Sequence, residues 1–160
     1  MDTQLTVGSP APDFALVSTY GQIRLSDYQG RQNVVLFFMR EFNCATCRQH
    51  VNHLKRLYDT FQARDTTVLV IGGGQKKDAE KLAHTFSTPF PVLADPDRSV
   101  YLRYSLDKVV MFVQRSGTMV VDKQGTLRYM QQAMLPTAAL EAEAVLRVIK
   151  SLQTAPLTVE

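Results

Sequence analysis

Two uninterrupted apolar runs, residues 34–39 and residues 68–71, lie in the first half of the chain. Strands that are apolar on both faces are typical of parallel sheets with helices packed against each side. Between the runs, apolar side chains recur at the spacing of one face of a helix. These residues are Val51, Leu54, Leu57, Tyr58 and Phe61. The pattern therefore predicts a helix from about residue 44 to residue 63 that connects two parallel, buried strands.

Shorter patterns of the same kind predict the rest of the fold. Residues 14–17 and 22–25 flank Tyr20-Gly21 and predict an N-terminal β-hairpin. Further along we expect a helix carrying Ala79, Leu82, Ala83 and Phe86, a strand at 91–94, a cap at Asp95-Pro96-Asp97 before a short helix carrying Val100, Tyr101 and Tyr104, strands at 109–113, 118–121 and 127–130, and a last helix that starts near Pro136. This order predicts an α/β protein with a thioredoxin-like fold. It has a central mixed β-sheet flanked by helices, with an N-terminal β-hairpin extension, in a single domain over residues 1–160.

Charge and hydropathy argue against two classes of partner. The net charge is +3, from 18 Lys and Arg against 15 Asp and Glu. Nucleic-acid-binding domains carry a clustered basic face and usually a pI above about 9. The longest apolar run, residues 34–39, is far shorter than the roughly 18 residues that a membrane-spanning helix needs. The N-terminal region lacks the apolar stretch of a signal peptide, so we expect a cytoplasmic protein without nucleic-acid or membrane partners.

The two cysteines, Cys44 and Cys47, lie where the first buried strand gives way to the first long helix. Residues three apart on a helix lie about 5–6 Å apart, within the roughly 4.4–6.8 Å Cα separation of a disulfide. Asn43 is the expected N-cap. The free N–H groups of the first turn stabilise a thiolate at Cys44, and Arg40 and Arg48 add positive charge. We therefore predict Cys44 as the attacking thiol and the more shielded Cys47 as the resolving thiol.

Other interpretations of these residues are less favoured. Two cysteines can simply be buried structural residues, but Cys-x-x-Cys on a strand-helix-strand pattern is typical of redox chemistry. Cys44, Cys47, His50 and His53 recur every third residue, yet on one helix they spread over about 13 Å, too far for one zinc ion.

Residues 72–74 are three glycines without the Gly-Lys-Ser/Thr of a phosphate loop, and we expect them to allow a sharp turn. No metal or cofactor is expected.

The N-terminal motif Val7-Gly8-Ser9-Pro10-Ala11-Pro12-Asp13-Phe14 resembles the opening of the peroxiredoxin-like alkyl hydroperoxide reductase/thiol-specific antioxidant family. Residues 34–40 followed by Cys44-Ala45-Thr46-Cys47-Arg48 resemble its branch with Cys-x-x-Cys. Residues 90–98 are similar to a later strand of the family and the short helix after it. Residues 120–125 are similar to the family's hairpin. The resemblance runs from about residue 7 to residue 130.

The resemblance implies a thiol-dependent antioxidant oxidoreductase that reduces peroxides through a Cys44–Cys47 dithiol/disulfide cycle. An external thiol such as thioredoxin or glutathione would restore the dithiol, without an organic cofactor. Aligned on Phe37-Phe38, the family's peroxidatic position falls on Thr46, between the two cysteines. The resemblance also implies that Arg115 is the family's activating arginine. Arg40, Asn43, Thr46 and Arg48 are the expected supporting residues.

Two other functions remain open at this point. A protein thiol-disulfide oxidoreductase would use the same dithiol on a disulfide substrate, with Cys47 resolving the mixed disulfide. A non-catalytic redox-sensing or binding module could also be built on the same fold. A homodimer is compatible with the sequence, because the apolar residues 109–113 suit either the core or a dimer surface, and we expect them in the core.

Overall fold

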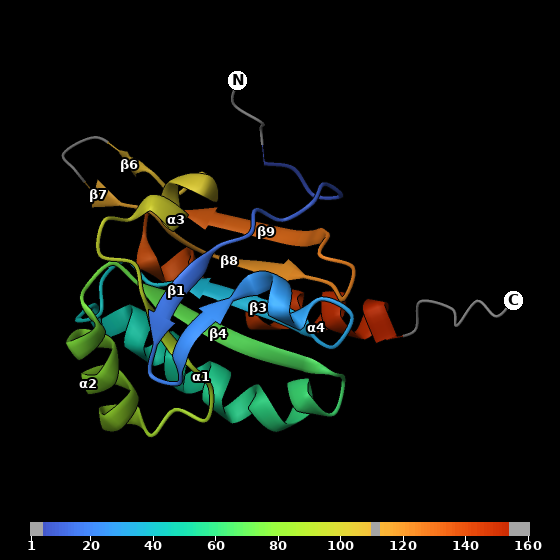
Figure 1. Cartoon of the computed structure of the whole chain (residues 1–160), viewed down its shortest axis with the longest axis horizontal. Helices are drawn as coiled ribbons and strands as arrows, with labels where there is room; N and C mark the ends of the chain where they lie inside the picture. The colour runs from blue at the N-terminus through green and yellow to red at the C-terminus, as the bar shows by residue number, and fades with distance from the viewer. Residues whose placement is uncertain (1–4, 110–112, 154–160) are drawn as a thin grey trace, which may run out of the picture.

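The computed structural model describes residues 5–109 and 113–153 (Figure 1). The strands are β1 (Ala15–Ser18), β2 (Gly21–Arg24), β3 (Asn33–Phe38), β4 (Thr66–Gly72), β5 (Val92–Ala94), β6 (Lys108–Val109), β7 (Val113–Gln114), β8 (Ser116–Val121) and β9 (Leu127–Ala133). The α-helices are α1 (Ala45–Gln62), α2 (Lys76–Phe86), α3 (Ser99–Arg103) and α4 (Ala142–Gln153). Two short 3-10 helices are η1 (Leu25–Tyr28) and η3 (Pro136–Ala138).

Seven strands form one mixed sheet in the order β2-β1-β5-β4-β3-β8-β9. Strands β3, β4 and β5 are parallel, because α1 and α2 provide the crossovers between them. Strand β8 is antiparallel to β3, and β9 is antiparallel to β8. The N-terminal hairpin of β1 and β2 joins the sheet at the free edge of β5. The predicted thioredoxin-like fold with an N-terminal hairpin extension is confirmed.

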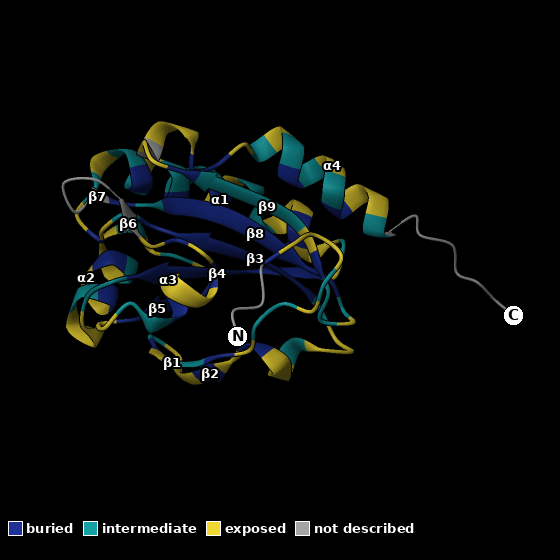
Figure 2. Ribbon diagram, turned by 90° about the horizontal axis from the view of Figure 1, so that it is seen from above, coloured by how far each residue is buried: buried dark blue, intermediate teal, exposed yellow. Residues whose placement is uncertain are grey.

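Two buried clusters lie on the two faces of the sheet. One cluster fills the space between the sheet and helices α1, α2 and α4, and the other lies beneath α3, η1 and the N-terminal segment. Figure 2 shows α1 and α4 on one side of the strands and α3 on the other. In β3, Val35 and Phe37 join the first cluster, whereas Leu36 and Phe38 join the second. Successive side chains of a strand point to opposite faces, which explains why this strand is apolar throughout.

The last helix begins later than predicted. Pro136 opens only the 3-10 helix η3, and α4 starts at Ala142. The hydroxyl of Thr118 in β8 donates a 2.6 Å hydrogen bond to the Ala139 carbonyl, and both Ala139 and Leu140 are buried. This contact ties the chain to the sheet between the two helices, and so interrupts the helix that the sequence pattern suggested.

The expected strand at 109–113 is also different. Strands β6 and β7 pair with each other as a separate two-stranded sheet and not with the central sheet. Residues 110–112, which connect them, lie outside the described residues, so the expectation that this segment belongs to the core stays a prediction. The side chain of the buried Gln114 donates a hydrogen bond to the Leu106 carbonyl, which joins the base of this hairpin to the segment before it.

Gly72, the last residue of β4, and the two glycines that follow it leave room for neighbouring side chains and do not adopt positive φ. The glycines with positive φ lie elsewhere, for example Gly30 and Gly125. A Cβ atom on Gly72 would lie 2.3 Å from the Phe42 ring, and one on Gly73 would lie 2.4 Å from the Arg98 guanidinium. The chain does bend at Gly73 and Gly74, between β4 and α2, as expected. In addition, two side chains from distant segments occupy the space beside Gly72 and Gly73.

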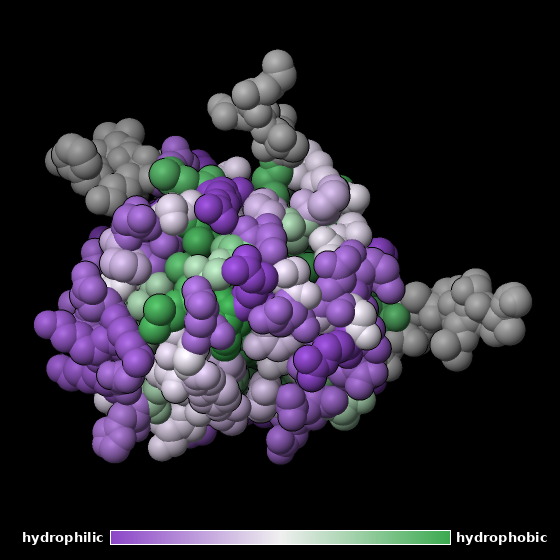
Figure 3. Space-filling model, in the orientation of Figure 1, coloured by the Kyte–Doolittle hydropathy of each residue, from purple (hydrophilic) through white to green (hydrophobic). Residues whose placement is uncertain are grey.

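The surface is mixed in polarity. On the face that Figure 3 presents, apolar side chains lie towards the centre and hydrophilic side chains surround them. The exposed large apolar residues of the described parts are Val7, Val17, Tyr20, Leu102, Met134 and Leu135. Among the described residues, no helix has the length and apolar character that crossing a membrane requires.

The close approach at Gly72 generates a stability prediction. Gly72→Ala is expected to lower the free energy of unfolding by about 1–3 kcal/mol, because the new methyl group overlaps the buried Phe42 ring. The same substitution made in a Phe42→Leu background should be less damaging, because leucine lacks the outer ring atoms. Urea unfolding of the four proteins measures the coupling. Equal losses in both backgrounds would contradict this packing.

Candidate active site

The candidate site lies where the carboxyl end of β3 meets the N-terminus of α1. Cys44, not Asn43 as predicted, is the N-cap of α1, with extended backbone angles of φ −69° and ψ 116°. Its sulfur accepts a 3.3 Å hydrogen bond from the Cys47 N–H. The thiol thus takes the role that the Asn43 side chain was expected to play, and Asn43 is exposed.

The two sulfur atoms differ in their access to solvent. Cys44 is partly exposed, whereas Cys47 is fully buried in the cluster beneath α1, together with Met39 and Phe42. The Cys47 sulfur accepts a 3.3 Å hydrogen bond from the Arg40 N–H. Burial raises the pKa of the Cys47 thiol to about 12, and the hydrogen bond with Cys44 adds to the rise. At neutral pH, Cys47 is therefore a protonated thiol beside an accessible one.

The residues expected to support the thiols act in different ways. Arg40 contacts Cys47 through its backbone N–H. The Arg48 side chain donates a 2.9 Å hydrogen bond to the Phe42 carbonyl, and its guanidinium lies 5.7 Å from the centre of the Phe86 ring. Arg48 therefore fixes the loop before α1. Thr46 lies in the first turn of α1 and is partly buried.

Two residues of the α3 region also hold this loop, and the sequence analysis did not assign them to the site. The Tyr101 hydroxyl donates hydrogen bonds to the carbonyls of Met39, at 2.6 Å, and Ile71, at 3.1 Å. The Arg98 guanidinium donates a 3.4 Å hydrogen bond to the Arg40 carbonyl and lies over the Tyr101 ring. The sequence shows Asp95 as a cap and Tyr101 in the helix that follows, but no neighbouring residue indicates what the Tyr101 hydroxyl contacts.

The predicted cap of α3 is confirmed and explains the placement of Tyr101. The buried Asp95 carboxylate accepts hydrogen bonds from the Val100 and Tyr101 N–H groups, at 2.9 and 3.2 Å. The Asp97 carboxylate accepts a 3.0 Å hydrogen bond from the Ser99 N–H. Helix N-termini carry N–H groups without partners inside the helix. Asp95 satisfies two of them, and thereby turns α3 so that Tyr101 points into the sheet.

Arg115 immediately precedes β8, at the end of the sheet where the thiols lie. Its guanidinium lies 3.8 Å from an Asp107 carboxylate oxygen and donates a 3.5 Å hydrogen bond to the Ser105 carbonyl. The Arg115 side chain is 32% exposed and that of Asp107 is 60% exposed. Of the contacts described for this guanidinium, none is to Cys44 or Cys47.

The histidines of α1 lie further along the helix. The His50 ring packs edge-on against Phe37, with 5.8 Å between the ring centres. His50 and His53 line a shallow surface hollow with residues of the segment that leads into α4. Within the described ranges, no group of three or more His, Cys, Asp or Glu side chains is arranged to hold a metal ion.

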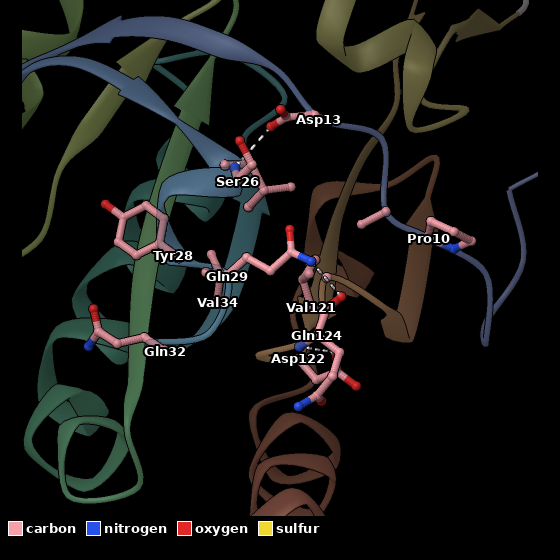
Figure 4. A pocket seen from close by; sticks show the side chains of 13 residues that line it. Pro10, Asp13, Ser26, Tyr28, Gln29, Gln32, Val34, Val121, Asp122 and Gln124 are labelled. Carbon is pink, nitrogen blue, oxygen red and sulfur yellow. Dashed lines mark hydrogen bonds between the residues drawn. The ribbon is translucent and has the colours of Figure 1, made fainter.

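Another hollow, shown in Figure 4, lies at the opposite end of the sheet from the thiols. Val34 at the start of β3 and Val121 at the end of β8 form part of its wall. Several of its polar groups are engaged within the protein. Asp13 accepts from the Ser26 N–H at 2.9 Å, and Gln29 donates to the Gln124 carbonyl at 3.1 Å. The dithiol end of the sheet is therefore the stronger candidate for chemistry.

A dithiol at the N-terminus of the helix that follows a central strand of this sheet is the arrangement of thiol oxidoreductases with the thioredoxin fold. The model of the AhpC/TSA family matches residues 7–130. The chain therefore belongs to the AhpC/TSA family, and it is an oxidoreductase. The predicted family and enzyme class are confirmed.

Relatives of both reaction types occur among the similar proteins. The thiol-disulfide oxidoreductase ResA of Geobacillus kaustophilus is 28% identical over 153 residues, which cover 94% of this chain and 80% of that protein. Peroxiredoxin 2 of Caldanaerobacter subterraneus subsp. tengcongensis is 27% identical over 158 residues, which cover 92% of this chain and 70% of that protein. A yeast mitochondrial 1-Cys peroxiredoxin structure has a TM-score of 0.83 at 22% identity, over 98% of this chain and 84% of that chain, and so shares the fold.

The burial of Cys47 predicts how stability depends on pH. Because its pKa is raised from an ordinary 9.0 to about 12 in the folded protein, the folded state holds this proton where the unfolded state has lost it. The free energy of unfolding should therefore fall as pH rises above about 9, by at most about 1.4 kcal/mol per pH unit. Urea unfolding between neutral pH and pH 10.5 measures this slope in Cys44→Ser, which cannot form the disulfide.

The matched control is Cys44→Ser/Cys47→Ala, which lacks the buried thiol. Its stability should be lower throughout because of lost packing, but it should change less with pH above about 9. Parallel curves for the two proteins would show that Cys47 is not shielded as the structure indicates.

Proposed function

We propose that this oxidoreductase reduces peroxides through a cycle in which Cys44 attacks and Cys47 resolves. The observation that carries the proposal is the asymmetry of the two thiols. Cys44 is partly exposed at the N-terminus of α1 and accepts a backbone N–H, whereas Cys47 is buried three residues later. A helix N-terminus favours negative charge, and the thiolate is the reactive form of cysteine.

The proposed chemistry runs in two steps. The Cys44 thiolate attacks a peroxide oxygen, so that an S–O bond forms, the O–O bond breaks and the departing oxygen takes a proton. Cys44 is then a sulfenic acid. Cys47 attacks that sulfur, the disulfide forms, and the sulfenic oxygen leaves as water with the Cys47 proton. An external thiol, such as thioredoxin or glutathione in a reducing cytoplasm, returns both residues to thiols.

Thiol-disulfide exchange is the second candidate, and one observation favours it. Aligned on Phe37-Phe38, the peroxidatic position of typical peroxiredoxins falls on the partly buried Thr46, and the thiols flank it. The similarity to ResA points in the same direction. In this reaction Cys44 would attack a substrate disulfide, and Cys47 would release the product thiol. A redox-sensing module would undergo the same oxidation without turnover.

Arg115 belongs to the proposal as the residue that assists peroxide cleavage. Its ion pair with Asp107 is partly exposed, and such pairs contribute only about 0–1 kcal/mol. The guanidinium can therefore leave Asp107 and bind a peroxide with little loss of stability. A fixed positive group beside the departing oxygen would stabilise the charge that develops there. In the same proposal Arg40, Asn43, Thr46 and Arg48 shape the surroundings of the thiols.

Thiol counting during a peroxide titration tests the cycle. One equivalent of peroxide is expected to remove two thiols from the reduced wild type, because both cysteines enter the disulfide. Cys47→Ser should lose one thiol and form a sulfenic acid that a cyclic diketone traps, whereas Cys44→Ser should lose none. If wild-type thiols persist with peroxide but disappear with a small disulfide, the exchange reaction replaces the peroxidase reaction.

Arg115 is tested by comparing two reactions of Cys44. Arg115→Ala is expected to slow oxidation by peroxide about tenfold or more, while alkylation by iodoacetamide, which has no peroxide oxygen to assist, changes less. Arg115→Lys should also be impaired, because lysine keeps the charge but lacks the planar fork. Arg128→Ala, which removes an arginine from β9 that pairs with Asp122 at 3.2 Å, is the control. Unchanged peroxide rates in both Arg115 variants would refute this role.

A further inference from the structure

Ser116, the first residue of β8, carries a buried hydroxyl that lacks a protein partner. The residue is 0% exposed, and its hydroxyl makes no hydrogen bond within the described residues. A buried polar group without a partner is unfavourable by about 1–3 kcal/mol. The other buried hydroxyl in this condition, that of Thr88, lies between α2 and β5. Most buried polar groups have a partner, so a buried hydroxyl without one calls for an explanation, of which a redox role is one.

The register of the sheet places Ser116 near the thiols. The last pair between β3 and β8 is Phe38 with Gly117, so one step further along sets Ser116 beside Met39. On its other side, Ser116 pairs with Ala133 of β9. Met39 and Ala133 both belong to the buried cluster that contains Cys47.

The alternation of side chains along β8 decides which face Ser116 occupies. Val120 belongs to the cluster beneath α1, and Thr118 donates its hydrogen bond to Ala139 just before α4. Side chains two residues apart on a strand share a face. Ser116 therefore lies on the α1 side of the sheet, at the end where Cys47 packs.

We propose that the Ser116 hydroxyl donates a hydrogen bond to the Cys47 sulfur while Cys47 attacks oxidised Cys44. The inference rests on the dithiol cycle proposed above. In the attack, the new S–S bond forms as the bond from the Cys44 sulfur to its departing group breaks. The Cys47 proton leaves with that group, as water from a sulfenic acid or as the thiol from a mixed disulfide. The Ser116 proton is not transferred.

The need for this donor follows from the surroundings of Cys47. In the reduced protein the donors to its sulfur are the backbone N–H groups of Arg40, at 3.3 Å, and of Glu41, and the side chain otherwise packs among apolar residues. Negative charge that develops on a buried sulfur is costly without further donors. The Ser116 hydroxyl lies on the same face of the sheet and has no partner among the described residues, so it can supply one without giving up another hydrogen bond. Hydrogen bonds to ionised groups are stronger than neutral ones.

A symmetrical aromatic disulfide that releases a coloured thiol separates the two steps. Cys44 attacks it and releases the first coloured thiol, and Cys47 then displaces the second. Ser116→Ala is expected to leave the first release unchanged and to slow the second about tenfold or more, because a hydrogen bond to a charged group is lost. Stopped-flow absorbance resolves the two phases.

Thr118→Val is the matched control, because it also removes a buried hydroxyl from the same face of β8. Thr118 loses a hydrogen bond to Ala139, so this variant should be less stable, with the rate of the second release unchanged. Reduced Ser116→Ala should be at least as stable as wild type, because no hydrogen bond is lost. Equal second-phase rates in Ser116→Ala and wild type, or equal slowing of both phases, would overturn the inference.

The same experiment distinguishes this inference from the proposed function. Its readout does not involve peroxide. If the protein does not react with peroxide but releases both coloured thiols, peroxide reduction is refuted, and the rate comparison still tests the role of Ser116. A wild type that releases only the first thiol would instead refute the Cys44–Cys47 cycle itself.

Discussion

The hydroxyl of Tyr101 holds together the part of the molecule on which the dithiol depends. It donates to the carbonyls of Met39 and Ile71, at the ends of two neighbouring parallel strands. These carbonyls lie where the sheet stops, and buried carbonyls need donors. Tyr101 reaches them from the face opposite to α1. The loop that leads to Cys44 is thereby held by a side chain from the buried cluster on the other face of the sheet.

The same loop is held at each of its next residues by a different partner. Arg98 donates to the Arg40 carbonyl, the Cys44 N–H donates to the Glu41 carbonyl, and Arg48 donates to the Phe42 carbonyl. With these carbonyls occupied, the Arg40 N–H is directed at the Cys47 sulfur. The positively charged residues around the thiols act here mainly as hydrogen-bond donors to the backbone. These contacts fix the backbone around the two thiols.

The two cysteine side chains are chemically identical but differ in burial. Cys47 is enclosed by apolar residues and its pKa is raised to about 12, so it is a protonated thiol at neutral pH. Cys44 caps the helix at the protein surface, where a substrate can approach. In the proposed function, peroxide reduction and thiol-disulfide exchange would both begin at Cys44 and end with Cys47.

The order of the elements, the apolar strands, the cap of α3 and the Cys-x-x-Cys at a strand-helix junction could all be read from the sequence, and with them the fold and the class of enzyme. These features are local, because periodicity and capping depend on residues a few positions apart. Three features could not be read from the sequence: Cys44 is the N-cap, α4 starts at Ala142, and Gly72 makes room for Phe42. Folding also leaves the buried Ser116 hydroxyl without a partner among the described residues, and it brings Arg98 and Tyr101 to the loop before the thiols. Their partners lie far away in sequence, as Arg40 does from Arg98, and packing of the two faces of the sheet brings them together.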